Sequence, residues 1–437
     1  MTQPGQDAQP VRGRERLERL GARVERGHDA SHVEDAVALI MTAAIPSDHP
    51  EVVRARERGI PVLKRADALG AWVNRGCVVG IAGTHGKTTT TAMTTEVLAA
   101  AGLDPTGLVG GTVPHWEGNL RAGGSDLFVV EADEYDRSFH TLEPDVAVVT
   151  NLEADHLDVY GDLDGVEEGF RVFLRRVRPQ GRVAVCGDDA GAARLLPALP
   201  GTGYSYGLSA GVQLRAVDVS QRPSGTRARV VEEGRELGDL ELGSPGLHNL
   251  RNALAAAAVG RHLGASWDQV REGLAAYRGV GRRFQRLGEV AGVALIDDYA
   301  HHPTEIQATV RATRDIYPDR RLVAVFQPHL YSRTRDFHRE FGRSLAGADV
   351  LWVSDVFPAR EKPLPGITGA LVADAATDAG AVDVRYHEDV ASMPEAVAGT
   401  LRENDVLLVM GAGSVEDVGP RVKALLTGGA DGAVTHA

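Results

Sequence analysis

A strand-like apolar run at residues 77–83, CVVGIAG, leads through a glycine-rich turn into a helix-like run at residues 88–103, TTTTAMTTEVLAAAGL. An apolar run without polar alternation is typical of a strand that is buried on both faces, as in a parallel sheet. Two further apolar runs, at 126–133 and 145–155, end in carboxylates. The order strand, helix, strand therefore predicts an α/β fold around a parallel sheet.

Length and pattern together predict three domains. A chain of 437 residues is too long for one ordinary hydrophobic core. Residues 1–74 contain two helical patterns, at 14–24 and 50–60, and one apolar segment at 36–46, which indicates a small α/β domain with few strands. Residues 75–278 contain the run described above and a strong helix pattern at 244–264. Glycine and arginine cluster at 278–288, and strands and helices alternate again through 279–437. We expect a truncated Rossmann-like N-terminal domain, a central parallel-sheet domain of the P-loop ATPase type and a Rossmann-like C-terminal domain.

The composition limits the classes of partner. The net charge of −13 argues against broad binding of nucleic acid or of an anionic membrane, since both require a basic face. Cys77 and Cys186 lie in apolar runs and are expected to be small core residues, so no disulfide is predicted. The polar first residues do not match a signal peptide, and no apolar stretch approaches the ~20 residues that cross a bilayer. We expect a cytoplasmic protein.

The turn between the first strand and helix is predicted to bind nucleotide phosphates. It reads Gly83-Thr84-His85-Gly86-Lys87-Thr88-Thr89. Phosphates require backbone N–H donors, a positive charge and a hydroxyl group for Mg²⁺, and this strand–loop–helix segment offers all three. The usual spacing places a glycine at position 81, where this chain has Ile81. The alternative interpretation is a glycine-rich turn that binds nothing.

Carboxylates follow the next two strands at the edge where ligands of open α/β sheets bind. Glu131, Asp133, Glu134 and Asp136 follow the first strand, and Asn151, Glu153, Asp155 and His156 follow the second. Because Mg²⁺ prefers oxygen ligands and bridges phosphates, Glu131 and Thr88 are predicted to form a first magnesium site. For Glu134 and Asp136, a solvated acidic edge is the alternative. His156 is either a metal ligand or a histidine that is hydrogen-bonded to a neighbouring carboxylate.

Eight segments in a fixed order resemble the Mur ligases of peptidoglycan synthesis. They are GIAGTHGKTTTTAM, EADEYDRSF, TNLEADHLDVY, GLHNLRNALAA, GVGRRFQ, DDYAHHPTE, FQPHLYSRTRDF and MGAGS. Together they cover nearly everything from about residue 25 to residue 415. A single motif such as GKT is a weak signal, whereas eight in order are specific.

The resemblance implies a role for each matching residue. Lys87 and Thr88 would hold the ATP phosphates and one Mg²⁺, Glu131 would complete that site, and His156 would reach a second Mg²⁺. Asn249 and Asn252, one helical turn apart, would contact adenine, because amides both donate and accept hydrogen bonds; for Asn252 an ordinary helix-face residue is the alternative. Arg283 would reach the phosphates and Asp298 the ribose. The amino-acid pocket would contain Tyr299, His301, His329 and Arg333, with Arg333 suited to clamping a carboxylate.

The sequence departs from the family pattern in two places. The family opens with a strand and a glycine-rich loop that bind UDP, and no such segment occurs in this sequence; roughly 40 residues are missing by comparison, enough for a βαβ start. In the family branch that matches best, a basic residue often follows FQPH, and here the residue is Leu330.

The branch that adds L-alanine to UDP-N-acetylmuramate fits best. Relatives that add D-glutamate or diaminopimelate carry a lysine about fifteen residues after the histidine, and the stretch after His156 contains no lysine. The implied reaction is phosphorylation of the muramate carboxylate by ATP, followed by attack of the L-alanine amine on the acyl phosphate, with His301 or His329 as the proton acceptor. The alternatives are a ligase that attaches a whole tripeptide to the same UDP-sugar and a non-catalytic nucleotide-binding protein. The sequence does not indicate an oligomeric state.

Overall fold

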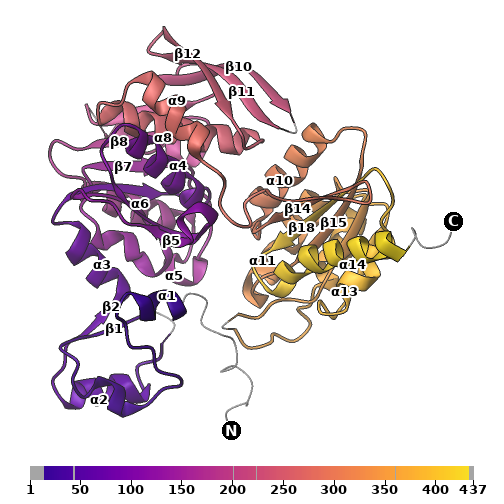
Figure 1. Cartoon of the computed structure of the whole chain (residues 1–437), viewed down its shortest axis with the longest axis horizontal. Coiled ribbons are helices and arrows are strands. Elements are labelled where there is room, and N and C mark those ends of the chain that lie inside the picture. Colours follow the sequence, from indigo (N-terminus) through magenta and orange to yellow (C-terminus); the bar gives the residue numbers. More distant parts are fainter. Residues whose placement is uncertain (1–13, 43–44, 200, 223, 360, 433–437) are drawn as a thin grey trace.

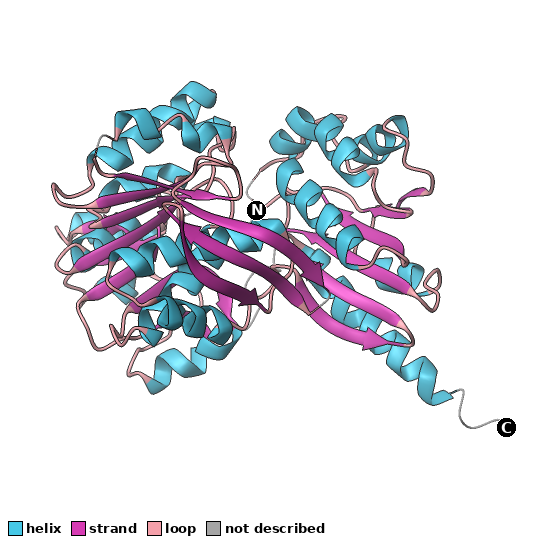
Figure 2. Cartoon of the chain, turned by 90° about the horizontal axis from the view of Figure 1, so that it is seen from above, coloured by secondary structure: helices cyan, strands magenta, loops and turns pink. Residues whose placement is uncertain are grey.

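The computed structural model describes residues 14–42, 45–199, 201–222, 224–359 and 361–432. Within them the strands form three separate sheets of two, ten and six strands, which follow one another along the chain (Figure 1). Seen from above, the two larger parts each have strands between layers of helices (Figure 2). This arrangement confirms the predicted α/β class with parallel sheets.

The N-terminal part is small. Its elements are α1 (Arg14–Arg19), η1 (Ala30–Val33), β1 (Leu39–Met41), α2 (Pro50–Glu57), β2 (Val62–Lys64) and α3 (Arg65–Val73). β1 and β2 are parallel, with Leu39 opposite Val62. The expected apolar segment 36–46 forms β1 only at its centre, and positions 43 and 44 lie outside the described residues. The expectation of few strands holds for the described residues of this part.

The central part contains the ten-stranded sheet, in the order β12-β11-β10-β9-β8-β7-β3-β6-β4-β5. The strands are β3 (Cys77–Ala82), β4 (Thr106–Val113), β5 (Gly118–Arg121), β6 (Leu127–Glu131), β7 (Val146–Val149), β8 (Arg182–Cys186), β9 (Gly203–Gly207), β10 (Leu214–Arg222), β11 (Gly225–Glu232) and β12 (Arg235–Leu242). The pairs from β4 through β6, β3, β7, β8 and β9 to β10 are parallel. β10, β11 and β12 extend the sheet with antiparallel pairs, which the sequence pattern did not predict.

Helices cover both faces of this sheet because its central strands have apolar residues on both faces. In β3, Val79 and Ile81 belong to one core, whereas Val78 and Ala82 belong to the core on the opposite face. The first core is covered by α4 (Lys87–Ala100), α8 (Leu247–His262) and α9 (Trp267–Ala276), and the second by α6 (Leu163–Arg175). The short elements are η2 (Pro114–Trp116), η3 (Tyr135–Thr141), α5 (Leu157–Tyr160), α7 (Ala190–Ala193) and η4 (Leu196–Ala198).

The C-terminal part contains the six-stranded sheet, in the order β13-β14-β18-β15-β16-β17. Its strands are β13 (Gln285–Val290), β14 (Val293–Asp298), β15 (Arg321–Gln327), β16 (Val350–Val353), β17 (Val384–Tyr386) and β18 (Asp405–Gly411). The neighbouring strands β14, β18, β15, β16 and β17 are parallel, and β13 is an antiparallel edge strand. The helices are α10 (Pro303–Ile316), α11 (Tyr331–Leu345), α12 (Ala370–Asp378), α13 (Met393–Ala398), η5 (Ser414–Asp417) and α14 (Val418–Gly432). Among the described residues, no helix is long and apolar enough to span a membrane.

Candidate active site

The loop from Gly83 to Lys87 connects β3 to α4 and has a shape that depends on glycine. Gly83 has φ +143° and Gly86 has φ +80°. A Cβ atom on Gly83 would lie 1.9 Å from Thr150 Oγ1, and one on Gly86 would lie 2.7 Å from Asn252 Oδ1. Ile81, at the position where the common motif has glycine, lies inside β3 and is fully buried. The strand therefore continues to Ala82, and the chain turns at Gly83.

Lys87 is the buried cation of this loop. Its Nζ donates to Glu134 Oε2 at 2.7 Å, to Glu134 Oε1 at 2.9 Å and to the carbonyl oxygen of Gly83 at 2.7 Å. Burial works against the charge, but Glu134 and the neighbouring carboxylates outweigh it and hold the pKa of Lys87 above its ordinary value. Glu134 is buried in this pair, so the solvated-edge interpretation is wrong for it. Asp136 is instead paired with exposed Lys64, at 2.7 Å.

Thr88 and Glu131 meet as predicted. The hydroxyl of Thr88 donates to Glu131 Oε1 at 3.0 Å, and the backbone N–H of Gly110 donates to Glu131 Oε2 at 2.6 Å. Asp133 lines one cavity together with Thr88 and Glu131, so a hydroxyl and two carboxylates converge there. Oxygen donors of this kind fit Mg²⁺.

His156 lines the same cavity from the loop after β7, where it is the N-cap of α5 in a left-handed backbone conformation with φ +53°. Its Nε2 lies 3.8 Å from Asp155 Oδ2 and 3.9 Å from Glu134 Oε1. Burial lowers the pKa of His156, against the attraction of Asp155. The imidazole is therefore neutral at pH 7 and keeps a nitrogen lone pair for a ligand.

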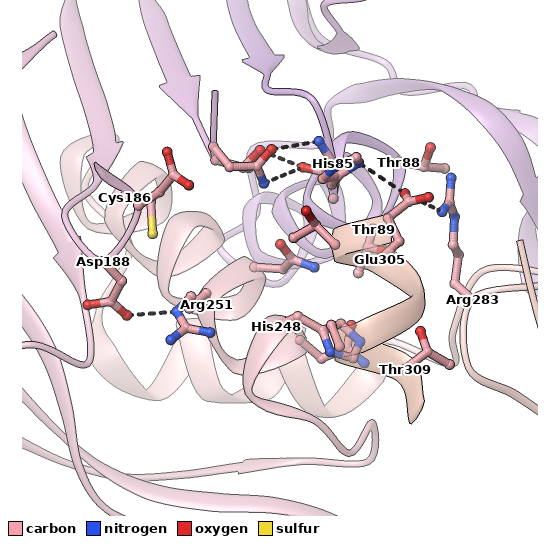
Figure 3. Close-up of a pocket in the computed structure, with 18 of the residues that line it drawn as sticks. His85, Thr88, Thr89, Cys186, Asp188, His248, Arg251, Arg283, Glu305 and Thr309 are labelled. Carbon is pink, nitrogen blue, oxygen red and sulfur yellow. Dashed lines mark hydrogen bonds and ion pairs between the residues drawn. The ribbon is translucent and has the colours of Figure 1, made fainter. Parts of the chain in front are cut away.

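A cavity of about 340 Å³ lies beside the loop, between residues such as His85, His248 and Arg283 (Figure 3). Both asparagines predicted to contact adenine line this cavity. Asn249 and Asn252 lie on α8 and are buried, with Asn249 Nδ2 donating to the carbonyl oxygen of Pro245 at 2.8 Å. Asp298 lines the cavity from the end of β14. Burial raises the pKa of Asp298 to about 6, although the charge of Arg283 opposes this shift. The carboxylate oxygens of Asp298 accept hydrogen bonds from the backbone N–H groups of Phe284 and Ala300, at 2.6 and 2.8 Å.

Several residues that line the same cavity were not predicted, and four of them carry acidic or basic side chains on the central part. These four are Asp188, Asp189, His248 and Arg251, and Asp188 Oδ2 accepts from Arg251 Nε at 2.7 Å (Figure 3). Asp188 and Asp189 directly follow β8, so the rule that identified Glu131 applies to them as well. His248 and Arg251 flank the predicted Asn249 on α8.

A second cavity, of about 700 Å³, brings together residues of the central and C-terminal parts. The predicted residues that line it are Thr84, His85, Gly86, Lys87, Thr88, Glu131, His156, Arg283, Tyr299, His301, His329 and Arg333. Arg283 lines both cavities, stacks on the ring of Tyr299 with its Cζ 5.0 Å from the centroid, and lies 3.5 Å from Glu305. Of the other predicted residues, Gly83 lies in the loop before α4, and Thr89 lies on α4 and lines the first cavity.

Arg333 holds a carboxylate of the protein itself. Its Nη2 lies 2.7 Å from Asp155 Oδ1, and both side chains are at least nine-tenths buried. Burial works against ionisation of Asp155, but Arg333 outweighs it and holds the pKa of Asp155 well below its usual range. Leu330, at the position where relatives often have a basic residue, is buried at the start of α11 and donates its N–H to the carbonyl oxygen of Phe357.

His85 connects the phosphate loop to the C-terminal part, a role that its place in the motif did not predict. Its Nδ1 lies 3.2 Å from Glu305 Oε1 and its Nε2 lies 3.6 Å from Glu153 Oε2. Burial opposes protonation, but Glu305 and Glu153 outweigh it and raise the pKa of His85 to about 9. The hydroxyl of Thr304 also donates to Glu153, at 2.6 Å.

His301 is neutral at pH 7. Burial lowers its pKa to about 3, although Glu305 lies 3.3 Å away. Its Nδ1 is 3.0 Å from the carbonyl oxygen of Tyr299, and its ring lies 5.7 Å from that of His329. A proton on His301 is therefore disfavoured at this buried position.

Three family models match the chain in succession. Residues 2–76 match "Mur ligase family, catalytic domain", residues 81–260 match "Mur ligase middle domain", and residues 282–413 match "Mur ligase, glutamate ligase domain". Curated proteins similar to this chain include the UDP-N-acetylmuramate–L-alanine ligase of Oleidesulfovibrio alaskensis, 44% identical over 92% of this chain and 89% of the relative. The ligase of the same name from Salinibacter ruber is 43% identical over 92% of this chain and 85% of the relative.

Solved structures agree with these matches. The UDP-N-acetylmuramate–alanine ligase of Thermotoga maritima superimposes with a TM-score of 0.80 at 28% identity, covering 94% of this chain and 90% of that one. A murein peptide ligase of Psychrobacter arcticus shares the fold, with a TM-score of 0.67 at 23% identity and coverage of 94% and 90%.

Proposed function

The chain belongs to the Mur ligase family, and from this we propose that it joins L-alanine to the carboxylate of UDP-N-acetylmuramate at the expense of ATP. The observation that carries the proposal is the second cavity. It places the phosphate-loop residues Lys87 and Thr88 opposite Arg283, His301 and His329 of the C-terminal part. A phosphoryl donor held by one part can therefore meet an amine held by the other.

The first step transfers the γ-phosphoryl group of ATP to the muramate carboxylate. A bond forms between a carboxylate oxygen and the γ-phosphorus, the bond from that phosphorus to the bridging oxygen breaks, and ADP leaves. Phosphoryl transfer depends mainly on positioning and on stabilising charge. Lys87 supplies a fixed positive charge on one side of the cavity, and Arg283 supplies another from the C-terminal part.

In the second step the amine of L-alanine attacks the acyl carbon. The C–N bond forms, the bond from that carbon to the phosphate oxygen breaks, and inorganic phosphate leaves with a former carboxylate oxygen. The amine must first lose a proton. His329 is the better candidate acceptor, because burial disfavours a proton on His301. Tyr299 and Arg333 complete the wall on this side.

In this proposal, the adenine base of ATP occupies the first cavity. Asn249 and Asn252 offer amide donors and acceptors to adenine, and Asp298 offers a carboxylate to the ribose. Thr88, Glu131 and His156 would hold Mg²⁺, with the hydroxyl and carboxylate forming the oxygen-rich side. When bound, this ion neutralises charge on the phosphates. We also propose domain limits of 1–74, 75–278 and 279–437, with the first domain holding the UDP part.

A test compares acceptors. We expect the purified protein to release ADP with UDP-N-acetylmuramate and L-alanine together, and the product mass to equal that of the amide. A protein that uses the tripeptide L-alanyl-γ-D-glutamyl-diaminopimelate and not L-alanine is the recycling ligase instead. Absence of turnover with either acceptor, with nucleotide still bound, indicates a non-catalytic nucleotide-binding protein.

A further inference from the structure

The described residues of the N-terminal part have a thin hydrophobic core. Between α1 and β2, the buried apolar side chains are those of Val33, Val52 and Ala55. Leu20, Val37 and Ile40 are exposed, and Val37 has 92% of its surface accessible. Its sheet has two strands of three residues each. A unit this small buries little apolar surface on folding, and small domains often gain stability from a bound metal.

Four metal-ligating side chains converge between the loop before η1 and the start of α2. Glu51 Oε1 lies 2.8 Å from His32 Nδ1 and 3.8 Å from His28 Nδ1, and Glu51 Oε2 lies 4.0 Å from His49 Nδ1. The rings of His28 and His49 meet edge to face, with centroids 4.6 Å apart. One potential ligand atom from each of His28, His49 and Glu51 lies within 4.8 Å of the others.

His49 is the unexplained member of this cluster. Both of its ring nitrogens are buried, and neither has a hydrogen-bond partner. It occupies the N-cap position of α2, but its side chain makes no capping hydrogen bond. Buried polar groups almost always have partners, and an imidazole without one loses its interaction with water for no gain. A metal ion bound to one of these nitrogens would give that nitrogen a partner and so reduce the cost.

We propose that His28, His49 and Glu51 bind a divalent zinc ion. Zinc ligands at 2.0–2.1 Å in a tetrahedral site lie about 3.3 Å apart, and Glu51 lies 3.8 Å from His28 Nδ1 and 4.0 Å from His49 Nδ1, so small shifts of these side chains would bring them to that spacing. Two imidazoles and one carboxylate suit Zn²⁺ better than Mg²⁺, which prefers oxygen ligands throughout. Three protein ligands leave the fourth position to water.

His32 supports the site without being a required ligand. Its Nδ1 is the nearest histidine atom to Glu51, and the backbone N–H of Asp29 also approaches Glu51 Oε1, at 3.3 Å. Hydrogen bonds of this kind orient a ligating carboxylate. The bound ion would join the loop at residue 28 to the first turn of α2 and so stabilise the part of the molecule with the smallest core. This site is separate from both cavities of the proposed active site.

The test is a calorimetric titration of the whole zinc-free chain with Zn²⁺, in the presence of excess ADP and Mg²⁺ so that the nucleotide site is filled. We expect one Zn²⁺ per chain and a rise in the unfolding temperature. His49→Asn and Glu51→Gln should each weaken zinc binding by about 100-fold or more, and His32→Asn by about 10-fold. His115→Asn is the matched control, because His115 is exposed and also pairs with a glutamate, Glu96, at 2.7 Å.

His302→Asn is a second control, because His302 belongs to another potential ligand group, with His85 and Glu153. Unchanged zinc affinity in His49→Asn and Glu51→Gln would overturn the proposal, as would a parent chain that binds no Zn²⁺ at micromolar concentrations. Co²⁺ bound to the parent chain tests the geometry even if a variant fails to fold. Strong visible bands of a four-coordinate ion are expected, and the weak spectrum of a six-coordinate ion contradicts the site.

Discussion

At the scale of single residues, Lys87 neutralises a buried carboxylate and lines the cavity in which we propose that the phosphates bind. Its Nζ contacts both oxygens of Glu134, so removal of the lysine has two consequences. We expect Lys87→Met to lower kcat/KM by about 10²–10³-fold or more, because a fixed charge at the transferred group is lost. It should also destabilise the fold by about 3–5 kcal/mol, because Glu134 is left buried and unpaired. ADP release and urea denaturation measure the two effects.

A double variant separates the effect of the lost charge on activity from the effect of the unpaired carboxylate on stability. Lys87→Met combined with Glu134→Gln should regain much of the stability and none of the activity. Lys64→Met removes an exposed lysine that also pairs with an aspartate, and should cost less than about 1 kcal/mol. Recovery of activity in the double variant would show that Lys87 acts only as a structural partner of Glu134.

His85 gives the molecule a pH dependence with a defined sign. Its folded-state pKa of about 9 lies above the ordinary value of 6.5, through its contacts with Glu305 and Glu153. The stabilisation is complete below pH 6.5 and is lost as the pH rises through 9, and it amounts to at most about 3 kcal/mol. Between pH 7 and pH 9.5, His85→Gln should therefore lose less stability than the parent chain. Equal slopes of unfolding free energy against pH in the two proteins would exclude this role.

At the scale of elements, the turn from β3 to α4 has no room for a side chain at Gly86. A methyl group there meets Asn252 of α8 at 2.7 Å, in a backbone conformation with φ +80°. We expect Gly86→Ala to weaken ADP binding by at least about 10-fold and to cost more than the ~1 kcal/mol of the conformation alone. Gly264→Ala has a similar φ of +91° and no atom within 4 Å of the added carbon. If the two variants bind ADP equally well, the contact between the loop and α8 has no effect on the nucleotide.

The elements around this turn were predictable because their patterns are local. The apolar run of β3, the glycines and the threonine-rich start of α4 follow one another directly. The convergence of the carboxylates that follow β6 and β7 was predictable because the carboxyl ends of parallel strands meet at one edge of the sheet. The antiparallel strands β11 and β12 carry charges on one face and were not recognised as part of the same sheet.

Contacts between distant segments could not be predicted in the same way. The partner of Lys87 is 47 positions away and was one of several carboxylates that follow β6. His85 meets Glu305, which is 220 positions later, and Arg333 meets Asp155, which is 178 positions earlier. The pairs of His85 with Glu305 and of Arg333 with Asp155 depend on how the central and C-terminal parts pack against each other, and residue spacing carries no information about that.

At the scale of the whole molecule, the pair of Arg333 and Asp155 holds the C-terminal part against the central part. Both side chains are buried at this interface. We expect Arg333→Met to leave Asp155 buried without a partner, and so to favour separation of the two parts. Small-angle X-ray scattering should show a larger radius of gyration, and the KM for ATP should rise. Arg335→Met, on the same helix but exposed and paired with Asp336, should change neither. Scattering curves that coincide for all three proteins would contradict this role of the pair.

The central claim is that the cavity between these two parts activates a carboxylate by transferring a phosphoryl group to it. The most direct measurement uses UDP-N-acetylmuramate labelled with ¹⁸O at both oxygens of the carboxylate, together with ATP, Mg²⁺ and L-alanine. We predict that each amide formed releases one inorganic phosphate carrying one ¹⁸O atom, visible by mass spectrometry. Inorganic phosphate without ¹⁸O, at the same yield of amide, would contradict an acyl phosphate and with it the assignment of this site.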